Sequence, residues 1–209
     1  MTLLGGSAFV SGGGSGIGRA IAQALATQGA AVAVMDLLPE GGKDTVASIA
    51  AKGGRATFVQ GDVGRWDDVD RAVAAAVREL GPLGIMVNAA GVLDGYARAD
   101  EIGPALWERV IGINLTGTFY GCKRALTEML PVGRGRIVNI ASVAGLGPMG
   151  SSIAYAVSKA GLIHLTRSMA VALAPETLVN CVAPGLRKAN ARRPISGPSR
   201  LSAPRPDRS

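Results

Sequence analysis

A glycine-rich run between residues 10 and 18 constrains this chain more than any other feature. The run Val10-Ser11-Gly12-Gly13-Gly14-Ser15-Gly16-Ile17-Gly18 follows an apolar segment and opens an amphipathic one. Glycine permits a tight turn and lets the backbone approach a pyrophosphate closely, and the N–H groups at a helix start attract that anion. A lone glycine cluster fits a flexible turn equally well, but its place between strand and helix favours dinucleotide binding. The expected phosphate-binding residues are Gly12, Gly14, Ser15, Gly16, Ile17 and Gly18.

Short β-rich runs alternate with longer amphipathic runs along the chain. Most of the short runs are apolar without alternation, which is typical of strands covered on both faces. The predicted strands span residues 7–11, 31–36, 56–62, 84–88, 136–141 and 178–182, and the predicted helices lie near 17–28, 41–53, 67–80, 103–130 and 153–174. This pattern predicts a three-layer α/β/α fold of the Rossmann type, with a doubly wound parallel sheet and right-handed crossovers.

The composition shifts sharply after Gly185 towards Arg, Pro, Ser and Ala. We expect one domain over residues 1–186 and a basic, disordered tail over 187–209. The tail carries +6 of the chain's formal net charge of +7, which leaves +1 for the other 186 residues. A nearly neutral body argues against a nucleic-acid partner. A tail that contacts RNA, DNA or an acidic protein stays open as an alternative.

The cysteine and histidine content bears on compartment and metal binding. Cys122 and Cys181 lie far apart without CxxC spacing, which is typical of buried thiols in a reducing compartment. No run reaches the roughly 18 apolar residues of a membrane span, and the N-terminus has no signal-peptide pattern. We therefore expect a soluble, cytoplasmic protein. His164 is the only histidine and has no neighbouring ligand group, so no metal site is expected.

Asp36 ends the second predicted strand, 24 residues after Gly12. A carboxylate at this position accepts hydrogen bonds from the adenosine ribose hydroxyls and repels a 2′-phosphate. Leu37 and Leu38 follow it and supply no cation, while Arg19 comes just after the glycine run. The sequence therefore favours NAD over NADP. A carboxylate that only caps a turn is the competing interpretation.

Tyr155 and Lys159 lie four residues apart in the predicted helix 153–174, which places them on one face. An ammonium near a phenol favours the phenolate and lowers its pKa, so the pair suits acid–base work on a carbonyl or alcohol. Ser142 directly follows a predicted strand, where its hydroxyl can hold a substrate oxygen. Asn114 lies inside the predicted helix 103–130, an unusual place for a short amide. Singly, each residue also fits an ordinary surface or loop role.

Together these motifs resemble the short-chain dehydrogenase/reductase family over roughly residues 3–186. The glycine run matches the family's glycine motif, and Asn114, Ser142, Tyr155 and Lys159 match its catalytic tetrad in order and in kind. Further motifs match at Asp62-Val63, Asn88-Ala89-Ala90-Gly91 and Pro184-Gly185. The resemblance implies that all three contact the cofactor: at the adenine, at the end of the fourth strand and beside the nicotinamide, respectively.

The resemblance also implies a reaction: hydride transfer between NAD(H) and a secondary alcohol or ketone. By this resemblance Tyr155 is the general acid/base, and Lys159 binds the nicotinamide ribose and lowers the phenol pKa. Ser142 orients the substrate oxygen, and Asn114 holds a water in a proton relay. Family members pair the helices corresponding to 103–130 and 153–174 across subunits, so we expect a homodimer or homotetramer.

After Gly185 the sequence departs from the family's pattern. Members usually continue with a Thr-containing loop, a substrate-covering segment, another helix and a last strand, and none of these is evident in residues 186–209. We expect a truncated or frame-shifted C-terminus, with the last helix and strand missing. Because the covering segment excludes water, the alternative function is a dinucleotide-binding remnant with little or no turnover.

Overall fold

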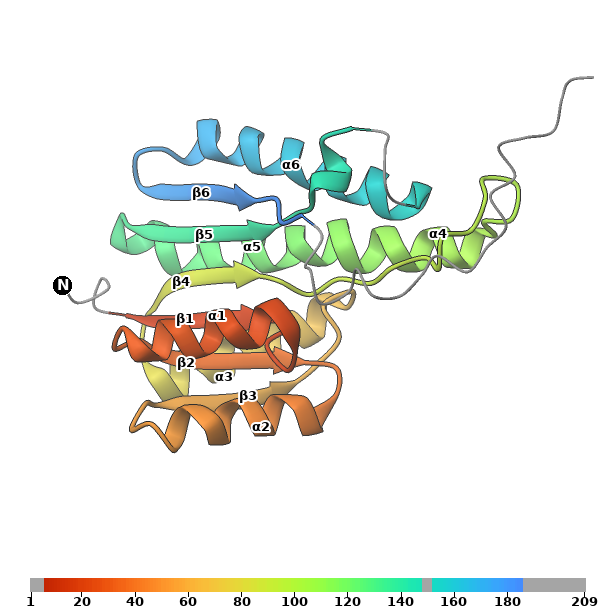
Figure 1. The fold of residues 1–209 in the computed structure, drawn as a ribbon. Helices are drawn as coiled ribbons and strands as arrows, with labels where there is room; N and C mark the ends of the chain where they lie inside the picture. The colour runs from red at the N-terminus through yellow and green to blue at the C-terminus, as the bar shows by residue number, and fades with distance from the viewer. Residues whose placement is uncertain (1–5, 148–151, 186–209) are drawn as a thin grey trace, which may run out of the picture.

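A computed structural model describes residues 6–147 and 152–185 of the chain (Figure 1). Six strands form one sheet in the order β3-β2-β1-β4-β5-β6, and every neighbouring pair is parallel. The strands are β1 Ser7–Ser11, β2 Ala31–Asp36, β3 Ala56–Gln60, β4 Leu83–Asn88, β5 Gly135–Ile140 and β6 Thr177–Val182. The chain order reverses between β1 and β4, and this switch point is where such sheets bind ligands. The predicted Rossmann-type doubly wound sheet is therefore confirmed.

Helices cover both faces of the sheet. They are α1 Gly16–Thr27, α2 Pro39–Ala50, α3 Trp66–Leu80, α4 Pro104–Ile111, α5 Gly117–Met129 and α6 Ile153–Leu173. One apolar cluster joins β1 and β2 to α1 and α2, and includes Val10, Ala22, Val34 and Ile49. The other joins the strands to α3, α5 and the end of α6, and includes Phe9, Val73, Met86 and Met129. The central strands β1, β2 and β4 are almost entirely buried, which explains their continuous apolar runs, whereas residues of the edge strands β3 and β6 are partly exposed.

The structure changes two predicted elements. The predicted strand 56–62 ends at Gln60, because Asp62 turns back and accepts the N–H of Gly64 at 2.8 Å. The predicted single helix 103–130 is interrupted by a π-helical turn, Gly112–Thr116, between α4 and α5. Hydrogen bonds in a π turn reach five residues instead of four, so the turn shifts the faces of the two flanking helices.

All six strands point the same way, so their carboxyl ends lie at one edge of the sheet (Figure 1). The predicted site residues follow β1, β2, β3, β4, β5 and β6 or lie on the helices beside that edge. The parallel topology therefore brings residues that are far apart in the chain to one place. The boundary predicted between residues 186 and 187, and the tail 187–209, lie outside the described residues.

Candidate active site

The glycine turn after β1 needs glycine for two separate reasons. Gly12 has φ +66° and Gly16 has φ +50°, in the left-handed region that side chains rarely adopt. A Cβ at Gly12 would also lie 2.7 Å from the backbone of Ala90, and a Cβ at Gly18 would collide with the carbonyl oxygen of Gly12. Nothing lies within 4 Å of a Cβ at Gly16, so the space beside that glycine is open.

The N-terminus of α1 is free of the usual cap. Ser15 occupies the N-cap position, and its side chain makes no capping hydrogen bond. Ser15, Gly16 and Ile17 are exposed, whereas Gly18 is buried. The first-turn N–H groups thus face outward with the positive end of the helix dipole. A closely approachable turn with uncapped N–H groups fits the pyrophosphate of a dinucleotide.

Asp36 is joined directly to this turn. Its Oδ2 accepts the N–H of Gly14 at 2.8 Å, and its Oδ1 accepts that of Leu38 at 3.1 Å. The Arg19 guanidinium donates to the carbonyl oxygens of Gly14 at 2.5 Å and Gly41 at 3.2 Å. Asp36, which is expected to bind the ribose, therefore lies beside the glycine turn. The Arg19 guanidinium is hydrogen-bonded to the same glycine, Gly14.

The ends of β3 and β4 complete this side of the site. Asp62 and Val63 follow β3, and the Val63 carbonyl oxygen lies 2.9 Å from where a Cβ of Gly117 would be. After β4, the N–H of Ala89 donates to the carbonyl oxygen of Ser11 at 3.2 Å. Because this bond extends the β1–β4 pairing past β4, Ala89 and Ala90 lie against the glycine turn.

Asn88 is placed differently from its neighbours. Its side chain is buried on the α5 side of the sheet, where Nδ2 donates to Oδ1 of Asn139 at 2.9 Å and to Sγ of Cys122 at 3.4 Å. Nδ2 of Asn139 in turn donates to the Thr166 hydroxyl at 3.0 Å. Only the backbone of Asn88 can therefore contact a cofactor at the carboxyl edge of the sheet. Its side chain connects β4 to β5 and α5 through hydrogen bonds.

Asn114 lies at the centre of the π turn and is fully buried. Its Oδ1 accepts the N–H of Val92 at 2.8 Å, and its Nδ2 donates to the Val92 carbonyl oxygen and the Ser158 hydroxyl, each at 3.0 Å. The amide thus joins the segment after Gly91 to α6. A relay water could meet this side chain only at the remaining acceptor site of Oδ1.

Tyr155 and Lys159 lie one turn apart at the start of α6. The Lys159 ammonium is 5.6 Å from the centre of the Tyr155 ring, and its Nζ donates to the carbonyl oxygen of Ile140 at 2.8 Å. A Cβ at Gly91 would lie 3.5 Å from that Nζ and 3.3 Å from Oδ1 of Asn114. Lys159 is 4 % exposed, and burial lowers the pKa of its ammonium to about 8. Gly91, Asn114, Tyr155 and Lys159 are therefore brought together.

Ser142 begins the short 3-10 turn Val143–Gly145 directly after β5. Its Oγ accepts the N–H of Ala144 at 3.2 Å, and its hydroxyl donates to no acceptor within residues 6–147 and 152–185. The Val143 N–H donates to the carbonyl oxygen of Pro184 at 3.1 Å, which brings Pro184 and Gly185 beside this turn. The ends of β5 and β6 thus place the predicted substrate-binding serine next to the predicted nicotinamide turn.

The sequence did not single out Asp94, which the structure places in the same region. This carboxylate is 4 % exposed and accepts the backbone N–H of Tyr155 at 3.3 Å. The Asp-Gly dipeptide at 94–95 indicates a turn. Local sequence gives no sign of the contact with Tyr155, because the two residues are 61 positions apart.

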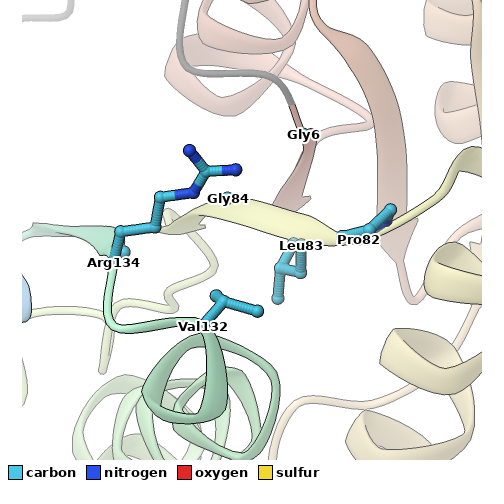
Figure 2. A pocket seen from close by; sticks show the side chains of 7 residues that line it. Gly6, Pro82, Leu83, Gly84, Val132 and Arg134 are labelled. Atoms are coloured by element: carbon cyan, nitrogen blue, oxygen red, sulfur yellow. The ribbon is translucent and has the colours of Figure 1, made fainter.

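Two other observations bear on what the molecule can bind. A hollow between the β4 start and the Val132–Gly135 segment lies at the amino end of the sheet (Figure 2), opposite the predicted site, so it does not serve that site. In residues 6–147 and 152–185, no group of three His, Cys, Asp or Glu side chains is arranged to hold a metal ion. No helix in the same residues has both the length and the apolar character needed to cross a membrane.

Comparison with known proteins assigns the family. Residues 7–198 match the short chain dehydrogenase family, so the match continues past Gly185, where the sequence motifs end. Cis-4-hydroxycyclohexanecarboxylate dehydrogenase of Sinomonas cyclohexanicum is 41% identical over 85% of this chain and 72% of its own length. Cyclohexanol dehydrogenase of an Acinetobacter species is 36% identical over 87% of this chain and 72% of its own.

Solved structures agree with this assignment. The crystal structure of an NAD⁺-bound xylitol dehydrogenase is 35% identical, with a TM-score of 0.83 over 87% of this chain and 70% of the other. The chain belongs to the short-chain dehydrogenase family. It is accordingly an oxidoreductase that acts on CH–OH groups with a nicotinamide dinucleotide.

Proposed function

We propose that this protein transfers a hydride between NAD(H) and a secondary alcohol or ketone. The observation that carries the proposal is the convergence of Lys159 and Asn114 beside Gly91, with the Tyr155 ring 5.6 Å from the Lys159 ammonium. This convergence lies at the carboxyl edge of the sheet, on the same edge as the glycine turn. A paired phenol and ammonium, next to an uncapped helix start, match the needs of dinucleotide-dependent alcohol chemistry.

Each polar residue has a separate task in this proposal. Hydride uptake and donation are the chemistry that a nicotinamide held at this edge would supply. Tyr155 takes the proton from the substrate hydroxyl, or returns it to the carbonyl oxygen. Lys159 supplies the positive charge that favours the phenolate, since an ammonium beside a phenol lowers its pKa. Ser142 donates its free hydroxyl proton to the substrate oxygen, because its Oγ already accepts the Ala144 N–H. Asn114 holds the segment after Gly91 against α6.

We further propose NAD as the preferred cofactor. Asp36 stands beside the phosphate turn through its hydrogen bond to Gly14, and its negative charge opposes a 2′-phosphate. Leu37 and Leu38 are exposed and offer no compensating cation. The remaining contacts of the dinucleotide are proposed at Gly12, Ser15, Gly16, Ile17, Gly18, Asp62, Val63, Ala89, Ala90, Gly91, Pro184 and Gly185, and at the backbone of Asn88.

The substrate class suggested by the relatives is a ring-borne secondary alcohol, since two of them are named for cyclohexane alcohols. Cyclohexanol and cis-4-hydroxycyclohexanecarboxylate are therefore the first probes, with xylitol as an open-chain comparison. The test measures NADH formation by the purified chain, with the Tyr155→Phe variant as control. Isothermal titration with NADH and NADPH measures cofactor binding separately.

The outcomes distinguish the proposal from its alternative. Turnover that Tyr155→Phe removes supports the dehydrogenase. Tight NADH binding without turnover on any secondary alcohol or ketone of a broad panel identifies a dinucleotide-binding remnant instead. Absence of binding to either dinucleotide would overturn both.

We propose that the protein assembles as a homo-oligomer through α4, α5 and α6. Side chains on these helices remain exposed although they are large and apolar, notably Trp107 (38 %), Phe119 (43 %) and Val157 (45 %). Light scattering coupled to gel filtration tests this, and a monomer at micromolar concentration would contradict it.

We also propose that the protein is located in the cytoplasm, because Cys122 and Cys181 are both free thiols.

A further inference from the structure

The first turn of α6 lacks a cap from its own sequence. The helix begins at Ile153, and the N–H groups of its first residues have no partner within the helix. Ser152 occupies the N-cap position, but its hydroxyl is buried and makes no hydrogen bond among the described residues. The Ala156 N–H is satisfied by the Ser152 carbonyl oxygen at 2.9 Å. Tyr155, one residue earlier, needs a partner from elsewhere.

Asp94 supplies that partner. Its Oδ2 accepts the Tyr155 N–H at 3.3 Å, and its other oxygen accepts the Tyr96 N–H at the same distance. The side chain is almost completely buried. A buried carboxylate at a helix N-terminus is also favoured by the positive end of the helix dipole.

The charge state of Asp94 agrees with this role. Burial raises the pKa of the carboxyl, but the Ser152 hydroxyl, which lies near it without a hydrogen bond, and the N–H groups of Tyr155 and Tyr96 lower it, and the net pKa lies below its usual value. In residues 6–147 and 152–185, no Lys, Arg or His nitrogen lies within 4 Å of it. The carboxylate is therefore held by N–H groups and the helix end instead of by an ion pair.

The same carboxylate fixes a strained turn. Gly95 has φ +73° and Tyr96 has φ +64°, and Tyr96 is the one described residue other than glycine in the left-handed region. An aspartate that accepts the N–H two residues on stabilises such a turn. The Tyr96 side chain is 64 % exposed. Asp94 thus connects the turn after β4 to the start of α6.

We infer that Asp94 is a positioning residue, which holds Tyr155 in its reactive place by capping α6 and anchoring the Gly95–Tyr96 turn against that helix. This inference rests on the proposed function, in which Tyr155 carries the proton. It assigns Asp94 no contact with the cofactor or the substrate. Its effect is on the orientation of the phenol, and small displacements of a reacting group reduce the rate strongly.

The test compares Asp94→Ala and Asp94→Asn with Asp100→Ala as the matched control. Asp100 lies in the same segment but is exposed and pairs only with Arg98 at the surface. Asp94→Ala is expected to lower kcat about 10- to 100-fold, with NADH affinity unchanged within about twofold. Asn retains one acceptor oxygen but turns its NH2 group toward the other N–H, so Asp94→Asn is expected to recover only part of the lost rate. Asp100→Ala is expected to match the unmodified protein.

Hydrogen exchange provides a readout that does not depend on activity. In Asp94→Ala, the amides of a peptide covering 153–157 are expected to exchange about tenfold faster or more, while peptides from β1 and α3 stay unchanged. Unchanged exchange at 153–157 would overturn the inference, even if the protein showed no turnover. Faster exchange with an unchanged kcat would overturn it as well. A chain that never shows activity refutes the proposed function alone, because the exchange result still decides whether Asp94 caps α6.

Discussion

The Nζ of Lys159 donates a 2.8 Å hydrogen bond to the carbonyl oxygen of Ile140 from a position that is 4 % exposed. The ammonium has no carboxylate partner among the described residues. Burial therefore removes water from around the charge without an ion pair to compensate for the loss. Burial accordingly lowers its pKa to about 8. An unpaired buried charge of this kind destabilises the fold and is retained where function requires it.

Replacing Lys159 with Met is expected to stabilise the protein at pH 7 while it abolishes activity. The pKa is 10.5 when the lysine is hydrated and about 8 in the folded chain, a penalty of about 3 kcal/mol at neutral pH. Loss of the bond to Ile140 offsets about 1 kcal/mol of the gain, so the net gain is about 2 kcal/mol. Urea denaturation at pH 7 measures it.

The same pKa sets the pH dependence of this difference. The unfolded chain binds the extra proton between pH 8 and 10.5, so the penalty is complete below pH 8 and fades as pH rises through this window. The advantage of Lys159→Met in the free energy of unfolding should therefore shrink between pH 8 and 10.5. A constant difference over that range would count against a desolvated lysine.

Tyr155→Phe is expected to reduce turnover about 10²- to 10⁴-fold, the usual contribution of a general acid or base. Phenylalanine preserves the ring beside the Lys159 ammonium and removes only the hydroxyl. NADH affinity measured by titration should hold within a few-fold. If the variant keeps most of its kcat, another group carries the proton.

Asp36→Ala is expected to shift cofactor preference towards NADPH. Removing the carboxylate beside Gly14 relieves like-charge repulsion worth several kcal/mol, and the Arg19 guanidinium held on that glycine remains. The ratio of NADH to NADPH affinity should fall about 10- to 100-fold, as measured by titration of both dinucleotides. Asp44→Ala, at an exposed position on α2, should leave the ratio unchanged.

Gly12→Ala and Gly53→Ala form a matched pair. Both positions have positive φ, but only Gly12 faces a close contact, with the Ala90 backbone, whereas nothing lies within 4 Å at Gly53. Gly53→Ala should cost about 1 kcal/mol of stability and spare dinucleotide binding. Gly12→Ala should cost about 2 kcal/mol or more and abolish binding, because the turn must move. Equal effects in denaturation and titration would show that Ala90 does not confine the turn.

The sequence was sufficient for the order of elements and for the edge at which the site lies. Buried parallel strands produce uninterrupted apolar runs, and glycine positions mark the turn after β1, so both were predictable from residue type. The C-terminal end of β3, predicted at residue 62 and found at Gln60, was less predictable. An apolar run does not show at which residue the hydrogen-bonded pairing of a strand stops. The predicted Asn114 and Lys159 do meet beside Gly91, and the Tyr155 ring lies 5.6 Å from the Lys159 ammonium.

Features that depend on contacts between distant segments could not be predicted. The π turn at Gly112–Thr116 has no composition of its own, and its centre is fixed by the bonds of Asn114 to Val92 and Ser158. The inward direction of the Asn88 side chain follows from the strand's register within the sheet. The contact between Asp94 and Tyr155 exists only once β4 and α6 are in place.

The bond between Asn88 and Asn139 also affects how accurately the sheet can assemble. These residues are direct partners across β4 and β5, in strands otherwise made largely of interchangeable apolar side chains. A slip of one residue would turn one amide to the opposite face and leave two buried polar groups unpaired, at about 1–3 kcal/mol for each. The Asn88–Asn139 pair therefore specifies the register of β4 against β5, because it makes misregistered sheets less stable even where they would bury similar apolar area.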